Sequence, residues 1–147
     1  MRSKRVTAAI ALATTLMLLA AQTTLAAHAV RHHGTHQIKQ TFGVDFDRGV
    51  FNGGPMSRED MQFDAVSPGH RYLHPEGSTI ARVGSNKPGY ALCASVALGV
   101  KDYDVAEEPP DSWFCLKTSA NRYVRFRLDA VHSDPGPITI TYTTWEL

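Results

Sequence analysis

The chain has 147 residues, of which 43% are hydrophobic and 20% are charged, and its formal net charge is +1. This composition excludes a disordered chain and provides enough apolar residues for one domain with a buried core. The near-neutral charge argues against nucleic-acid binding, which needs concentrated positive charge.

Residues 1–29 have the pattern of a secretory signal peptide. Arg2, Lys4 and Arg5 form a positive start, and an apolar run and then small residues suited to signal peptidase follow them. The apolar run is too short for a convincing membrane anchor. We therefore predict a secreted protein without integral membrane contact, and loss of the segment would change the formal charge from +1 to −2.

Residues 30–40 are predicted to form a flexible leader, because they are polar, rich in histidine and without an apolar period. If cleavage frees the α-amine of Val30, that amine, two amide nitrogens and the imidazole of His32 can hold Cu(II) or Ni(II) in a square plane. His33 and His36 would add further imidazoles. Cleavage a few residues earlier removes this site, so a leader that binds no metal is the alternative.

Residues 41–147 have the pattern of an all-β fold. The stretches 124–131 and 138–145 alternate between apolar and polar residues, whereas 91–98 and 112–118 are more continuously apolar and suit central strands. Turns rich in Gly and Pro separate these runs. We predict about eight strands in a single antiparallel β-sandwich domain, or alternatively a β-barrel.

Cys93 and Cys115 are the two cysteines of the chain. In an exported protein an even number of cysteines predicts disulfide bonding, and two cysteines allow one pairing. Their spacing differs from the C-x-x-C pattern of redox and zinc sites. We therefore predict one structural disulfide bond.

The stretch FGVDFDRGVF allows three interpretations. As a strand, it turns its apolar residues to the core and Asp45 and Asp47 to water. As a calcium loop, it lacks ligands at its fifth and twelfth positions and needs help from Glu59, Asp60 or Asp64. As a pair of glycosidase acids, it shows nothing that marks either carboxyl as desolvated. The strand is preferred, and the other two interpretations stay open.

The hairpin NRYVRFR supplies most of the candidate ligand-binding residues. Tyr123, Arg125 and Arg127 make a basic, aromatic strand that can bind anions or stacked rings. Alternatively, the arginines pair with carboxylates across the sheet. Trp113 follows an acidic loop at residues 101–112, and it is either a contact residue or a core residue that covers the disulfide.

Three stretches, PGYALCASV, SWFCLKTSANRYVRFRL and ITITYTTWEL, resemble a small secreted β-domain of actinobacterial exported proteins. The resemblance covers residues 42–147 and is carried by the spaced cysteine pair, the K-T…R-Y hairpin and the closing T-T-W. It implies the fold and an extracellular compartment. The family has no assigned activity, so the resemblance implies no catalytic residues.

Together these features predict a secreted, non-catalytic binding domain that acts as a monomer without a cofactor. Its partner would be an unknown extracellular ligand or protein, such as a cell-wall or other extracellular polymer. The first alternative is an extracellular hydrolase that acts on a wall polymer. The second is an exported metal-binding protein that uses the His-rich N-terminal segment.

Overall fold

The computed structural model describes residues 27–52 and 59–147. The predicted signal peptide falls on residues 1–29, so all but its last three residues lie outside the described residues. Within the described ranges, no helix has both the length and the apolar character that are needed to cross a membrane.

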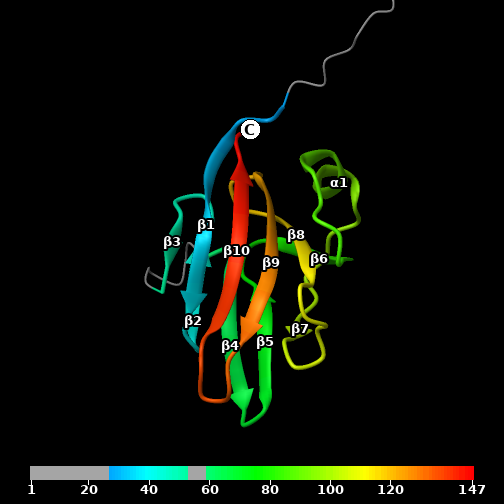
Figure 1. Cartoon of the computed structure of the whole chain (residues 1–147). Coiled ribbons are helices and arrows are strands. Elements are labelled where there is room, and N and C mark those ends of the chain that lie inside the picture. The colour runs from blue at the N-terminus through cyan, green and yellow to red at the C-terminus, as the bar shows by residue number, and fades with distance from the viewer. Residues whose placement is uncertain (1–26, 53–58) are drawn as a thin grey trace, which may run out of the picture.

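In the described residues, ten strands form two antiparallel sheets that pack face to face (Figure 1). The first sheet has the order β1 (Val30–Ile38), β10 (Ile138–Trp145), β9 (Tyr123–Val131), β8 (Trp113–Lys117), β6 (Thr79–Gly84). The second sheet has the order β3 (Val50–Phe51), β2 (Phe42–Asp45), β4 (Met61–Ser67), β5 (His70–Pro75), β7 (Tyr103–Asp104). Each described sheet keeps two edge strands, which confirms the predicted all-β sandwich and not the barrel.

The core lies between the two sheets and follows the predicted alternation of β9 and β10. Val124, Phe126 and Leu128 point inward from β9 and are at most 2% exposed. The ring of Phe126 stacks on the rings of Phe46 and Phe114, with centroids 5.9 and 4.9 Å away. The polar residues between these positions therefore lie on the outer face of the first sheet.

The predicted flexible leader at residues 30–40 is wrong, because most of it forms the edge strand β1. This strand pairs with β10 along its whole length. Its inward positions include Gly34 and His36, which pack beside Tyr142, and the His36 ring also stacks on Phe51 with centroids 4.1 Å apart. Glycine and imidazole take the place of aliphatic side chains here, so the strand has no apolar period to detect.

The strand predicted at residues 91–98 is also wrong, because its first part forms the short helix α1 (Tyr90–Ser95). Cys93 is the buried residue of this helix and forms the predicted disulfide bond with Cys115 of β8. The helix lies outside the first sheet and buries one side, whereas a central strand would bury two. Alanine and leucine are good helix formers, so their apolar run serves either structure.

Candidate functional site

The outer face of the first sheet is partly covered by α1. The disulfide bond between Cys93 and Cys115 fastens the helix to β8, and both cysteines are completely buried. The rings of Tyr90 and Trp145 complete the cover and meet nearly at right angles, with centroids 5.6 Å apart. Trp145 therefore covers the disulfide. Trp113 is buried, as one of its two interpretations predicts, but it does not belong to the cluster around the disulfide.

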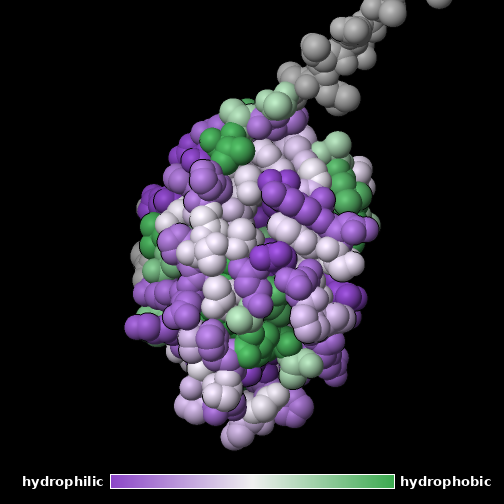
Figure 2. All heavy atoms as spheres, in the orientation of Figure 1, coloured by the Kyte–Doolittle hydropathy of each residue, from purple (hydrophilic) through white to green (hydrophobic). Residues whose placement is uncertain are grey.

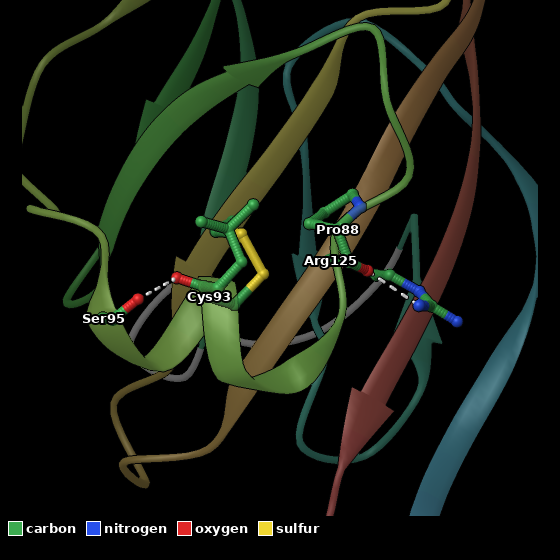
Figure 3. The surroundings of a disulfide bond; sticks show 6 residues. Pro88, Cys93, Ser95 and Arg125 are labelled. Carbon is green, nitrogen blue, oxygen red and sulfur yellow. Dashed lines mark hydrogen bonds between the residues drawn. A yellow bond between two sulfur atoms is a disulfide. The ribbon is translucent and has the colours of Figure 1, made fainter.

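Arg125 projects from β9 at the border of this cover (Figure 3). Its Nη1 donates a hydrogen bond of 2.8 Å to the carbonyl oxygen of Pro88, and its guanidinium lies 5.1 Å from the centre of the Trp145 ring. Its buried Nε has no acceptor among the described residues, and no described carboxylate forms an ion pair with it. Burial lowers the pKa of the guanidinium from its usual value, because desolvation disfavours charge. The group still carries its charge at neutral pH.

A hollow of about 490 Å³ opens beside Arg125, over β1 and β10. We call it the basic hollow, because His33, Lys87 and Arg125 line it and no acidic residue does. The hydroxyl-bearing residues of its lining are Thr35, Thr141, Tyr142 and Thr143. Guanidinium and ammonium groups beside hydroxyls bind carboxylate, phosphate and sulfate groups, so this arrangement suits an anionic ligand.

Arg127 lies two residues further along the same face of β9, in different surroundings. Its Nε donates a hydrogen bond to Asp129, and its Nη1 lies 3.5 Å from a carboxylate oxygen of Asp111. Its guanidinium also lies 5.7 Å from the centre of the Trp113 ring. Two carboxylates thus face Arg127, and this arginine is paired as the alternative interpretation of the hairpin predicts. Arg125 has no such carboxylate partner among the described residues.

The two aromatic ligand candidates are both used for packing. Tyr123 contacts the ring of Tyr90 with centroids 5.5 Å apart and belongs to the disulfide cover. Trp113 is 7% exposed and lies beneath Arg127. Neither side chain lines the basic hollow. Of the four predicted ligand-binding residues, the structure therefore places Arg125 alone in this hollow.

The predicted metal-ligating histidines do not converge. His33 lines the basic hollow, whereas His32 and His36 point to the other side of β1. Residues 30–32 are extended and paired with β10, so a square-planar site at Val30 would require them to leave the sheet. Among the described residues, no group of three potential metal ligands includes a histidine.

Asp45 and Asp47 instead lie close to a third carboxylate, that of Asp60. One oxygen from each lies within 4.8 Å of the others. Asp60 is completely buried and accepts hydrogen bonds from the backbone N–H groups of Phe46 and Ser119 and from the Ser119 hydroxyl. Burial, assisted by the two nearby carboxylates, raises the pKa of Asp60 to about 6, although the backbone hydrogen bonds oppose this rise.

Arginines balance the two partly exposed carboxylates of this cluster. Arg48 lies 3.7 Å from Asp45, and Arg122 donates a hydrogen bond of 3.2 Å to Asp47. A shallow hollow of about 310 Å³ lies beside them, but Asp60 does not line it. The calcium interpretation thus gains a third carboxylate while two of the three are already ion-paired. The acid-pair interpretation gains a raised pKa on a carboxyl group that does not reach this hollow.

The acidic stretch at residues 101–112 is mostly an exposed loop, but it is attached to the rest of the fold. It contains β7, which pairs with β5. Asp102 forms a hydrogen bond of 2.6 Å with His74, and Glu108 lies 2.8 Å from the guanidinium of Arg82. Asp102 and Glu108 therefore bind neighbouring segments of the same chain.

Sequence reasoning missed several residues that shape the basic hollow. The sequence offers no binding signal at Lys87 or Pro88, and Trp145 enters the sequence analysis only as part of the closing T-T-W motif. The period of β10 contains a usable signal, because it places Thr141, Thr143 and Trp145 on the face opposite the core. The contact between Pro88 and Arg125 has no sequence signal, since it depends on how the disulfide positions α1.

Comparison with known proteins found no matching family model, no matching curated protein and no matching solved structure. The assignment of the site therefore depends on the geometry around Arg125 and on the chemistry of the residues beside it.

Proposed function

We propose that this protein is a secreted, non-catalytic binding domain, and that its basic hollow holds an anionic group of an extracellular or cell-wall polymer. The observation that carries the proposal is Arg125, a guanidinium fixed by Pro88 and Trp145 that has no carboxylate partner among the described residues. The disulfide bond fits an oxidising extracellular compartment. We further propose a monomer that belongs with the secreted β-domains it resembles.

Three features support a polymer rather than an isolated small anion. The hollow lies on the open face of β1 and β10, and a chain can cross this face with one unit inside. Lys87 extends the positive charge beyond Arg125, so consecutive anionic units can be contacted. The basic groups stand on paired strands and on a segment next to the disulfide, so little order has to be gained on binding.

Calorimetric titration with four polymers tests the proposal and identifies the anionic group. Polygalacturonate offers carboxylates, polyphosphate offers phosphates, dextran sulfate offers sulfates, and dextran is the uncharged control. We expect one polyanion to bind more tightly than dextran, and we expect Arg125→Met to weaken that binding by roughly tenfold or more, the range of a hydrogen bond to a charged group. Arg127→Met removes the same charge from the same strand and should change the affinity by less than about twofold.

The titrations are run near physiological ionic strength, because dilute buffer exaggerates the binding of any basic surface. Binding of all three polyanions no tighter than dextran would overturn the proposal. Equal losses in the two arginine variants would also overturn it, because general electrostatic attraction would then explain the binding. Release of sugar or phosphate products during incubation would contradict the non-catalytic assignment.

A further inference from the structure

A second hollow, of about 440 Å³, lies between the two sheets at the end of β9 and shares no residue with the basic hollow. Figure 2 shows hydrophobic residues gathered at the surface beside the end of β9, near the segment that contains β7. The apolar residues of its lining include Val105, Ala106, Pro109, Leu128, Ala130 and Val131. We call it the apolar hollow.

The pairing of the strands explains why the core is accessible here. β8 begins at Trp113, which pairs with Arg127, while β9 continues past this pair to Val131. The last residues of β9 therefore have no paired strand on the β8 side. The segment that follows β7 lies across this gap and forms the opposite wall. Val105 and Leu128 belong to the main core cluster, so the floor of the hollow is part of the core.

One charged side chain in the wall has no counterion. Arg71 is 7% exposed, and its Nη1 donates hydrogen bonds to the carbonyl oxygens of His132 and Gly136, at 2.9 and 3.3 Å. It forms no ion pair with any described carboxylate. Hydrogen bonds from Gly69 and Gln40 are the main causes that lower the pKa of the nearby Asp134, and the charge of Arg71 adds a smaller contribution in the same direction.

The acidic residues that line the apolar hollow are already paired. Glu108 lies 2.8 Å from the guanidinium of Arg82, and Asp129 accepts a hydrogen bond from Arg127. Arg71 is therefore the one charged residue of this lining that has no ion-pair partner among the described residues. An apolar surface beside one unpaired guanidinium is complementary to an apolar molecule that carries one carboxylate.

We propose that the apolar hollow binds a small carboxylic acid with an apolar body. The body lies on Val105, Leu128 and Val131, and the carboxylate accepts hydrogen bonds from Arg71. The volume lies within the usual range of small-molecule sites, roughly 300–1,000 Å³. This site is independent of the proposed polymer site, because the two hollows lie on different parts of the sandwich.

Titration of the ¹⁵N-labelled protein with decanoate tests the proposal, with decanol as the uncharged probe of equal chain length. We expect saturable amide shifts at Ala106, Ala130 and Val131 with decanoate, and an affinity for decanol that is roughly tenfold lower or weaker still. Arg71→Met should weaken decanoate binding to a similar degree. Arg125→Met, which alters the basic hollow alone, should leave decanoate binding unchanged.

Arg71 also holds the 132–136 segment, so a second variant covers the case in which Arg71→Met does not fold. Ala106→Leu adds volume at an exposed lining residue and leaves the hydrogen bonds of Arg71 intact. We expect it to reduce decanoate affinity by roughly tenfold or more. The proposal is overturned if decanoate gives no saturable shift, if decanol binds equally well, or if Ala106→Leu or a folded Arg71→Met protein binds decanoate like the wild type.

Discussion

Two arginines on the outer face of β9 are nearly identical in sequence context and opposite in electrostatic environment. Arg125 and Arg127 are two residues apart, and each guanidinium lies over a buried tryptophan ring, Trp145 or Trp113. Arg127 faces two carboxylates, whereas Arg125 bonds to a carbonyl oxygen and has no described carboxylate partner. The difference comes from the segments that cover the strand, because α1 and its lead-in border one site and the acidic 101–112 stretch borders the other.

This comparison separates arginines that support the fold from an arginine suited to a ligand. An ion pair at a partly exposed position contributes little net stability, but it removes the charge from the reach of other anions. A partly buried guanidinium without a counterion costs free energy unless an anion satisfies it. The same contrast sets Arg71, which has no counterion among the described residues, apart from Arg82, which pairs with Glu108 of the apolar hollow.

The largest expected effect comes from removing the tryptophan beneath each arginine. Trp145→Ala and Trp113→Ala should each lower the free energy of unfolding by about 3 kcal/mol, because each deletes a buried aromatic side chain. Trp145→Ala alone should also weaken polyanion binding, since it removes the support of Arg125. Urea unfolding gives the stabilities, and the polymer titration gives the affinities. Equal loss of affinity in both variants would contradict the distinction between the two arginines.

A smaller effect concerns Asp60, a buried carboxylate that is hydrogen-bonded but has no cation beside it. Its pKa in the folded protein, about 6, lies above the unfolded value of 3.8, so the folded state binds more protons between these values. The contribution of Asp60 to stability is therefore greatest below that window and is lost as the pH rises through 6. Lowering the pH from 7 to 5 should raise the free energy of unfolding by about 1 kcal/mol.

Urea unfolding at several pH values measures this contribution, with Asp60→Asn as the reference that isolates one carboxyl from the others. Glu59 and Glu108 also have pKa values raised chiefly by burial. They shift the stability with pH in the same direction in the wild type and in the Asp60→Asn variant, so the difference between the two curves reports Asp60. The variant should lose part of the slope that the wild type shows between pH 5 and 7. Parallel curves for the two proteins would show that Asp60 does not titrate in this range.

The sequence predicted the fold class, the strands β8, β9 and β10 and the disulfide, because alternation and cysteine pairing are local or unambiguous signals. It did not predict β1, where Gly34 and His36 occupy inward positions. It also did not predict α1, whose apolar run fits a central strand as well as a helix. Both failures occur where an element packs on one side only, β1 at an edge of the first sheet and α1 on its outer face, and such packing weakens the periodic signal.

The candidate site was predictable in part. Arg125 was selected from its strand, but the sequence treated Arg127 in the same way, because both alternate outward from an apolar core. The carboxylates that distinguish them are Asp129, on the same strand as Arg127, and Asp111, whose pairing depends on how the 101–112 stretch crosses β9. Tertiary contacts of this kind leave no trace in a single sequence.

The smallest expected effect is also the most direct test of the comparison, because it removes one of the two carboxylates that face Arg127. Asp129→Asn keeps the shape of the side chain and an oxygen that accepts the hydrogen bond from Thr141, but it removes the charge beside Arg127. We expect polyanion affinity to rise roughly twofold to threefold, because a partly exposed ion pair is worth about 0.5 kcal/mol. The same substitution in an Arg127→Met background changes the net charge equally, yet it should give no such rise. A rise that persists without Arg127 would mean that net charge, and not the pairing of one guanidinium, governs binding on this face.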